Sequence, residues 1–138
     1  DTGAAVPVAG LAAVAGLSFS VLIAPTTTPR RIEHLVGLCS GFVYLLARVG
    51  ITGERDDAPD VAGRVAAIRK LTDLPIAVGF GISRPEHVEA VTACAEAAIV
   101  GSALVRRMGE ADNPVSAAGA LVRRLAAGLA PAGTPRGS

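Results

Sequence analysis

The chain has few aromatic residues. It contains no tryptophan, one tyrosine and three phenylalanines in 138 residues, so aromatics make up 3% of it. This scarcity argues against an aromatic-cored β-sandwich, whereas hydrophobic residues at 51% provide enough Ala, Val, Ile and Leu for a core. The length allows one domain at most. The composition therefore favours small-residue packing of helices on a parallel sheet.

The net charge of the chain is also small. Thirteen Lys and Arg residues nearly balance twelve Asp and Glu residues, which gives a net charge of +1. This charge does not indicate a surface that binds nucleic acid. The arginine pairs at 106–107 and 123–124 are interpreted as solvated helix faces. No apolar run approaches the roughly 18 to 20 residues of a membrane-spanning helix, and the start of the chain has no basic segment typical of a signal peptide. We expect a soluble cytoplasmic protein that binds neither nucleic acid nor membrane.

Cysteine and histidine are too few, and too far apart, for an evident metal site. Cys39 and Cys94 lack metal-ligand spacing, and we expect two buried free thiols rather than a disulfide. His34 and His87 fall on predicted helix surfaces, where we expect both to be solvated.

Four apolar segments alternate with helical patterns. Such alternation is typical of right-handed βαβ units in a parallel sheet. The expected strands are Ser18–Ala24, Phe42–Ala47, Pro75–Gly79 and Ala97–Gly101. A weak Ala-rich helix over Val6–Ala15, ending at Gly16, precedes them.

The remaining helices are predicted from their capping residues and apolar stripes. The capping residues are Thr28, Asp60, Ser83 and Asn113, and a short helix runs over 103–109. The inward positions are Ile32, Leu35, Val36, Cys39, Val61, Val65, Ile68, Leu71, Val88, Val91, Ala95, Val115, Ala118, Val122 and Leu125.

Four βα units are about half of a (β/α)8 barrel, which typically takes about 250 residues. We predict that residues 1–127 form half of such a TIM barrel, the alternative being a small open α/β sheet. Residues 128–138 are small and rich in Pro and Gly, and we expect a flexible tail.

Glycine turns follow the last two predicted strands. Gly81 and the pair Gly101-Ser102 stand where backbone N–H groups point out of a sheet toward a following helix. A phosphate dianion is the natural ligand of such groups, and barrels commonly bind phosphate after strands seven and eight. A βα turn also uses glycine merely to reverse direction. Two such turns in succession favour the phosphate interpretation.

Three blocks of sequence resemble a known family. FVYLLARVGITGERDD (42–57), LPIAVGFGIS (74–83) and AAIVGSALVRRM (97–108) closely resemble the C-terminal half of the tryptophan synthase α chain. SVLIAPTTTP (20–29) is similar to the fifth strand of that family and the turn after it. The likeness covers roughly residues 17–125. The blocks are specific in combination, whereas each alone is weak.

The resemblance implies a lyase of tryptophan biosynthesis. Members of this family cleave indole-3-glycerol phosphate to indole and glyceraldehyde 3-phosphate by a retro-aldol reaction, without a cofactor of their own. They pass indole to a β subunit that carries pyridoxal phosphate. By resemblance, Gly53, Gly81, Gly101 and Ser102 would bind the substrate phosphate, mainly through backbone N–H groups with the Ser102 hydroxyl as a further donor. Phe80 would flank the phosphate end of the pocket.

Two further residues acquire supporting roles through the same resemblance. Tyr44 would point its hydroxyl into the site from the end of its strand, and Thr52 would lie in a loop that closes over substrate. For Phe42, Tyr44 and Phe80 the alternative is core packing, which is favoured for Phe42. For Thr52-Gly53 the alternative is a solvated turn, and Arg48 is as well explained by a pair with a loop acid.

The proton donors of the reaction are missing from this sequence. In the family the catalytic Glu and Asp come from the early part of the barrel, and the acids here fall on predicted helix surfaces, caps or the 48–57 loop. The turn Ala95–Ala98 also departs from the family's Gly-Ala-Asp-Gly pattern. We therefore expect the isolated chain to be an inactive fragment that keeps the phosphate site.

Half a barrel leaves two strand edges and an inner face open, and both favour self-association. Two alternatives to the lyase remain at this point. One is another phosphate-binding half-barrel of amino-acid biosynthesis, against which the 42–57 segment argues. The other is a non-catalytic scaffold module.

Overall fold

The structure is a computed structural model that describes residues 3–46, 61–79 and 81–129. Its four strands form one parallel sheet in the order β1-β2-β3-β4. In chain order the elements are α1 (Ala5–Val14), β1 (Leu22–Ile23), α2 (Pro29–Val36), β2 (Val43–Leu46), α3 (Val61–Arg69), β3 (Ile76–Gly79), α4 (Pro85–Thr92), β4 (Ala97–Ile99), α5 (Ser102–Gly109) and α6 (Pro114–Ala126). The predicted fold of four parallel strands with alternating helices is confirmed.

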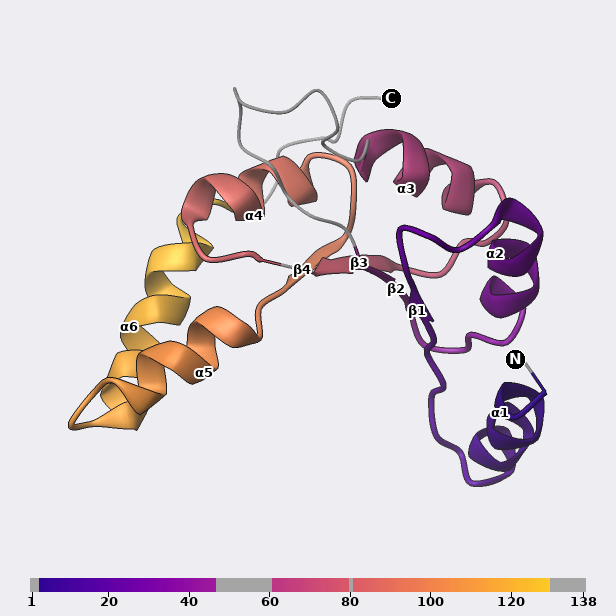
Figure 1. Ribbon diagram of the computed structural model, residues 1–138, viewed down its shortest axis with the longest axis horizontal. Coiled ribbons are helices and arrows are strands. Elements are labelled where there is room, and N and C mark those ends of the chain that lie inside the picture. Colours follow the sequence, from indigo (N-terminus) through magenta and orange to yellow (C-terminus); the bar gives the residue numbers. More distant parts are fainter. Residues whose placement is uncertain (1–2, 47–60, 80, 130–138) are drawn as a thin grey trace.

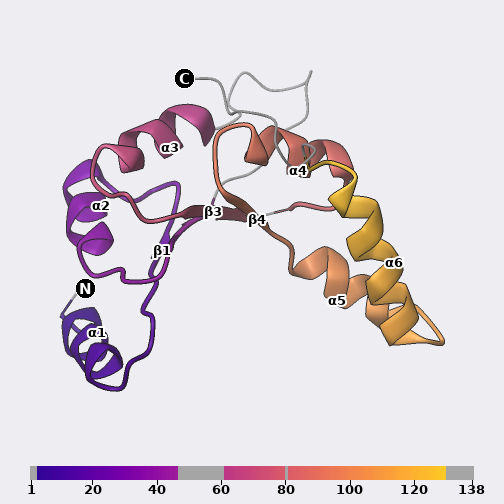
Figure 2. The same ribbon diagram turned by 180° about the vertical axis from the view of Figure 1, so that it is seen from behind.

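The helices form an arc around one face of the sheet. Helices α2, α3 and α4 cover that face, while α1 lies beyond β1 and the pair α5 and α6 lies beyond β4 (Figure 1). The view from behind shows the same arc, whose hollow side is the other face of the sheet (Figure 2). We call the helix-covered side of the sheet its convex face and the other side its concave face.

The core lies between the convex face and the helices. Val43 and Leu45 of β2, and Ile76 and Val78 of β3, are all completely buried there, as the alternation of side chains along a strand requires. The helices contribute the other large buried side chains, chiefly Val65, Ile68, Val88, Val91, Leu121 and Leu125. Burying this apolar surface holds the helices against the sheet.

The concave face is apolar but uncovered by other elements of the described chain. Leu22 of β1 is 47% exposed, and Tyr44 and Leu46 of β2 are half-buried. Ala97 of β4 is exposed and Ile99 is half-buried. An apolar sheet face in contact with solvent marks a surface that another part of a protein usually covers.

Several predicted element ends agree with the structure and others do not. Gly16 adopts the left-handed conformation (φ 68°) expected of a residue that ends a helix. The side chain of Asn113 accepts a hydrogen bond from the amide of Ser116 and so caps α6 as predicted. Thr28 stands at the predicted cap of α2 but its side chain makes no capping bond. The prediction for Ser83 is wrong, since Arg84 occupies the cap position of α4.

The first predicted strand is too long. Only Leu22 and Ile23 pair with β2, whereas Phe19 exchanges hydrogen bonds with Ser40 instead. The Ser40 hydroxyl accepts from the Phe19 amide at 2.9 Å, and the Ser40 amide donates to the Phe19 carbonyl at 2.8 Å. The apolar run before Leu22 therefore belongs to a connection rather than to the sheet.

Four predicted core positions are exposed. Leu71 is 45% exposed, Val115 80% and Val122 55%, so these three residues do not face inward. In α6 the buried position is Leu121 rather than Val122, together with the predicted Leu125. Phe42, for which core packing was favoured, is 38% exposed just before β2 begins.

Packing continues slightly past α6. Gly128 is buried, and a β-carbon at this position would lie 2.0 Å from the carbonyl oxygen of Pro85 at the start of α4. The last predicted tail residues, 130–138, lie outside the described residues.

Cys39 and Cys94 are both thiols and both half-buried. Burial raises the pKa of the Cys39 thiol, which donates a weak hydrogen bond to the Leu35 carbonyl. Within the described ranges no group of three or more His, Cys, Asp and Glu is arranged to hold a metal ion. No helix in the described part is long and apolar enough to cross a membrane.

Candidate functional site

The two predicted glycine turns follow neighbouring strands at the same end of the sheet. Strands β3 and β4 are parallel, and Gly79 pairs with Ile99. Gly81 and Gly101 each come two residues after this pair, so the two turns leave the sheet together at the carboxyl ends of the strands. We call this edge the carboxyl end of the sheet and the opposite edge its amino end.

Gly81 has a backbone conformation that residues with a β-carbon rarely adopt. Its φ is +72°, in the left-handed region, where an L-residue with a β-carbon is strained. It is exposed, and a β-carbon there would meet no other atom within 4 Å. Glycine is thus required by the backbone rather than by crowding, and the space around it stays open to a ligand.

Gly101 and Ser102 begin helix α5. The amides of Leu104 and Val105 both donate to the Gly101 carbonyl, at 2.9 and 3.1 Å. The amides of Ser102 and Ala103 precede this first hydrogen-bonded turn and have no place in it, as at any helix start. Gly101 and Ser102 are exposed. Such a helix start favours an anion because its amides and its dipole both point outward.

Tyr44 lies on the concave face and leans toward the carboxyl end. It pairs with Ala77, yet its hydroxyl oxygen lies 2.7 Å from where a β-carbon of Gly79 would be, two residues further along β3. Tyr44 is the second residue of β2 and not the last, so the hydroxyl reaches toward the carboxyl end by the length of its ring. The absence of a side chain at Gly79 is what leaves room for that ring.

The other predicted site residues, Thr52, Gly53 and Phe80, lie outside the described residues, as do Arg48 and the cap residue Asp60.

The amino end of the sheet carries an acid, Glu96, that binds Ile76 and Arg69. Glu96 Oε2 accepts from the Ile76 amide at 2.8 Å and forms an ion pair with Arg69, while the Glu96 amide donates to the Ile76 carbonyl at 3.0 Å. Arg69 also donates to the Leu74 carbonyl at 3.1 Å. Glu96 belongs to the turn Ala95–Ala98 that departs from the family pattern, and its carboxylate links the end of α3, the start of β3 and the residue before β4.

The described acids do not provide a proton donor at the carboxyl end. Glu96 lies at the opposite end, and the strand residues of the concave face include no carboxylate. The other described acids are all exposed on helices or connections, namely Glu33, Asp73, Glu86, Glu89, Glu110 and Asp112. The described residues at this end of the sheet thus include the glycine turns and the start of α5, but no carboxylate on the strands.

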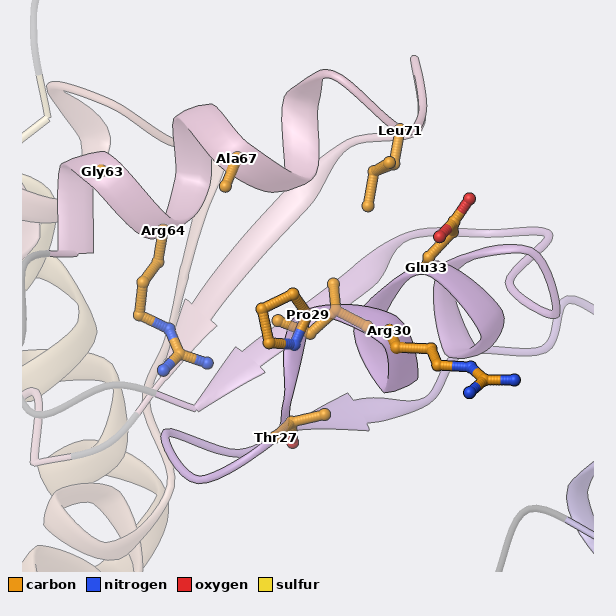
Figure 3. A pocket seen from close by; sticks show the side chains of 9 residues that line it. Thr27, Pro29, Arg30, Glu33, Gly63, Arg64, Ala67 and Leu71 are labelled. Atoms are coloured by element: carbon orange, nitrogen blue, oxygen red, sulfur yellow. The ribbon is translucent and has the colours of Figure 1, made fainter.

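A groove of about 930 Å³ lies between α2 and α3 on the convex side. Figure 3 shows the Arg64 side chain extending from α3 toward the β1–α2 connection, with Pro29 and Thr27 nearby. The guanidinium donates to the carbonyls of Pro25 and Ala24 at 2.6 and 2.8 Å. Arg64 therefore fixes this connection and leaves the groove without a convergent set of polar groups.

The prediction that His87 is solvated is also wrong. It is only 7% exposed in the first turn of α4, whereas a solvated position was expected, and its Nδ1 lies 3.2 Å from the Ser83 amide. The available signal was its position three residues after the helix cap, where a side chain reaches back to the backbone. His34 is exposed on α2, as predicted.

Comparison with known proteins gives the family. A sequence model described as the tryptophan synthase alpha chain matches residues 3–129. The tryptophan synthase alpha chain of Solibacter usitatus is 53% identical over 92 residues, which are 66% of this chain and 34% of that protein. That of Thermosynechococcus vestitus is 41% identical over 125 residues, 89% of this chain and 47% of the other.

Solved structures agree with the sequence matches. A structure of Mycobacterium tuberculosis tryptophan synthase in its aminoacrylate-bound form aligns with a TM-score of 0.73 at 28% identity, covering 88% of this chain and 44% of the other. A tryptophan synthase alpha-subunit mutant from Pyrococcus furiosus aligns with a TM-score of 0.70 at 29% identity and is covered to 49%. The described fold is thus similar to about half of these proteins, and the chain spans less than half the length of these relatives. The chain belongs to the tryptophan synthase alpha chain family.

Proposed function

We propose that this chain forms the phosphate-binding half of a tryptophan synthase α subunit, which cleaves indole-3-glycerol phosphate to indole and glyceraldehyde 3-phosphate. The observation that carries the proposal is the common exit of the Gly81 and Gly101 turns from hydrogen-bonded parallel neighbours. Amides at the two turns would bind the phosphate, with the Ser102 hydroxyl as a further donor. Gly53, Phe80 and Thr52 belong to the same proposal by resemblance.

Tyr44 has the second role in this proposal. Its hydroxyl reaches past Ala77 to Gly79, so the ring borders the path from the concave face to the glycine turns. An indole ring is flat and apolar, and the apolar concave face offers such a substrate a matching surface. The carboxylates that protonate the indole and deprotonate the glycerol hydroxyl would come from another polypeptide segment, and the chain alone would be inactive.

The sheet edges support the proposal that a complementary half closes the barrel. Beside β4 an apolar groove of about 230 Å³ is lined by residues of α4, β4, α5 and α6, among them Val100, Leu104 and Val122. Beside β1 a second groove includes Leu22, Leu35 and Ala5 of α1. Each groove borders an edge strand, so an added parallel strand would pair with the edge and fill the groove.

A second copy of the chain fits this arrangement less well than a different half does. Helix α1 already lies beyond β1, and α5 with α6 lies beyond β4 (Figure 1). Joining β4 of one copy to β1 of another would bring α1 and α6 to the same edge. Self-association is nevertheless proposed when no complement is present, because the edges and the concave face are apolar. Sedimentation showing a stable monomer would contradict it.

Co-expression tests the function directly. The chain is produced with the N-terminal half of a relative such as that of Solibacter usitatus, and indole release from indole-3-glycerol phosphate is measured. We expect activity only when both polypeptides are present. A well-folded complex that releases no indole would contradict the proposal. For the assembled enzyme, we further propose a partner β subunit that carries pyridoxal phosphate and a cytoplasmic location.

A further inference from the structure

The end of helix α6 is in close contact with the start of helix α4. Gly128 follows α6 and is buried, and a β-carbon there would lie 2.0 Å from the carbonyl oxygen of Pro85 and 2.8 Å from its carbonyl carbon. Both atoms are backbone atoms of the first residue of α4, so they cannot swing aside as the end of a flexible side chain can. Glycine is therefore required at position 128 because two backbones approach closely there.

A second contact joins α6 to the connection before α4. The Arg124 guanidinium donates to the Ser83 carbonyl at 3.3 Å. Arg124 and Gly128 are four residues apart, about one helical turn, so the two contacts lie on the same side of α6. Leu125 between them is 5% exposed and belongs to the core. The end of α6 lies beside α4 in both views (Figure 1 and Figure 2).

These contacts surround the residues that follow the Gly81 turn. Only three residues separate Gly81 from Pro85. Of these, Ile82 is 2% exposed in the core, and Ser83 is the residue that accepts from α6. Gly81 itself is exposed, and a β-carbon there would meet no other atom within 4 Å. The place of the Gly81 amide is therefore set by its neighbours, and α6 fixes where those neighbours enter α4.

Helix α6 also packs on the helix that follows the other glycine turn. Helix α5 begins at Ser102, directly after Gly101, and α5 and α6 are in contact along the chain's most extensive helix pair among the described elements. The α6 helix thus contacts the elements that leave both turns. The spacing of the two turns is set within the sheet by the pairing of β3 with β4 and, outside the sheet, by α6.

We propose that the end of α6 positions the Gly81–Ser83 turn, with Gly128 and Arg124 as the positioning residues. The inference rests on the proposed function, since Gly81 is one of the proposed phosphate donors. Neither Gly128 nor Arg124 touches substrate in this account. A side chain at position 128 would force α6 and the start of α4 apart, and the Gly81 turn would shift relative to the Gly101 turn because α5 stays packed on α6.

The test uses the 138-residue chain and glycerol phosphate. The affinity is measured by calorimetry, and the amide signals of Gly81–Ser83 are followed by NMR. Gly128→Ala adds the β-carbon that has no room. Gly109→Ala at the end of α5 is the matched control, because a β-carbon at Gly109 would meet nothing within 4 Å.

Further variants separate positioning from a general loss of stability. Arg124→Met removes the donor to Ser83 and keeps a long side chain, whereas Arg124→Lys keeps a donor. Arg123→Met changes the neighbouring arginine, which is also exposed, and is the matched control. Leu121→Ala opens a cavity at a buried position of α6 but leaves both contacts with α4 in place. Binding is measured at a temperature at which circular dichroism shows every variant to be folded.

We expect Gly128→Ala to shift the Gly81–Ser83 signals and to lower the glycerol phosphate affinity about tenfold, as for loss of one hydrogen bond to a charged group. Arg124→Met should shift the same signals and lower the affinity about threefold, and Arg124→Lys should recover most of that loss. The three control variants should stay within about twofold of the wild type.

Three results would overturn the inference. The first is Gly81–Ser83 signals that are the same in Gly128→Ala as in Gly109→Ala. The second is wild-type affinity in Gly128→Ala, and the third is an affinity that falls as far in Leu121→Ala, since the loss would then follow stability. If Gly128→Ala does not fold, the Arg124 variants decide by the same criteria. If the signals shift as expected but the wild type binds no glycerol phosphate, the positioning role is supported and the proposed phosphate site fails instead.

Discussion

The two ends of the β3–β4 pair differ in the side chains that surround the backbone. At the amino end, the Glu96 carboxylate accepts from the Ile76 amide and pairs with Arg69, so three elements are joined. At the carboxyl end, Gly81 and Gly101 carry no side chain, and a β-carbon at either position would meet no other atom within 4 Å. In barrel enzymes the carboxyl end ordinarily carries function and the amino end stability. In the four strands described here, the ion pair joins elements at the amino end and the exposed glycines lie at the carboxyl end.

Substitution of Gly79 should have the largest effect, because packing at the carboxyl end depends on it. A β-carbon there would lie 2.7 Å from the Tyr44 hydroxyl oxygen and 3.0 Å from Cβ of Ile99. We expect Gly79→Val to lower the free energy of unfolding by about 3 kcal/mol through overpacking. Urea denaturation measures it.

Gly101→Ala is the matched control for that substitution. A β-carbon at Gly101 meets nothing within 4 Å and its φ of −119° is not in the left-handed region, so the free energy of unfolding should change by less than about 1 kcal/mol. Equal effects of the two substitutions would contradict the distinction between a crowded Gly79 and an open Gly101.

Removal of the Glu96 carboxylate tests the amino end. Glu96→Ala leaves the Ile76 amide and the Arg69 guanidinium without this acceptor. We expect a loss of about 1 kcal/mol in the free energy of unfolding, as for the loss of a part-buried hydrogen bond. Glu89→Ala, which removes an exposed carboxylate from α4, should stay within about 0.5 kcal/mol of the wild type. If the two variants were equally stable, the amino end would not be held as described.

A side chain at Gly81 separates backbone strain from crowding. Because φ is +72° and the surrounding space is open, Gly81→Ala should cost about 1 kcal/mol of stability from conformation alone. The same change should weaken binding of glycerol phosphate, measured by calorimetry, because the turn would shift. Unchanged affinity together with the expected loss of stability would remove Gly81 from the proposed phosphate site.

The smallest expected effect concerns the thiol of Cys39, next to the Ser40 connection before β2. Burial raises its pKa above the ordinary value of 9.0. Above that pH the unfolded chain releases the proton first, so stability falls as the pH rises. Between about pH 8 and about pH 10, the wild type should therefore lose slightly more stability than Cys39→Ala. Parallel pH profiles in thermal unfolding would contradict the burial of this thiol.

Much of the architecture follows from local sequence. Apolar runs such as Val43–Leu46 and Ile76–Gly79 are bounded by glycine and charge, and the strands lie within the predicted ranges. Gly16 follows the end of α1 with a positive φ, and Asn113 caps the start of α6. Both features depend only on residues close in sequence. The prediction that the Gly81 and Gly101 turns follow neighbouring strands at one end of the sheet is confirmed, while the role of these residues in a site stays a prediction.

The wrong predictions of burial concern residues whose environment is set by segments distant in sequence. In α6 several apolar or small residues compete for the inward face, and contacts with α4 and α5 select Leu121 over Val122. His87 is polar and looked solvated, yet Arg124 and Gly128, about forty residues further along the chain, pack near the start of α4. Local periodicity does not contain these contacts. The residues 47–60 that complete the predicted site lie outside the described part.

NMR mapping of bound glycerol phosphate on the complete chain tests the central claim most directly. The account predicts that the largest amide shifts occur at Gly81, Ser102 and Ala103, and that the amides of Ile76 and Glu96 at the amino end stay unchanged. Shifts confined to the amino end or to the α2–α3 groove, or no shifts at all, would contradict a phosphate site at the carboxyl end.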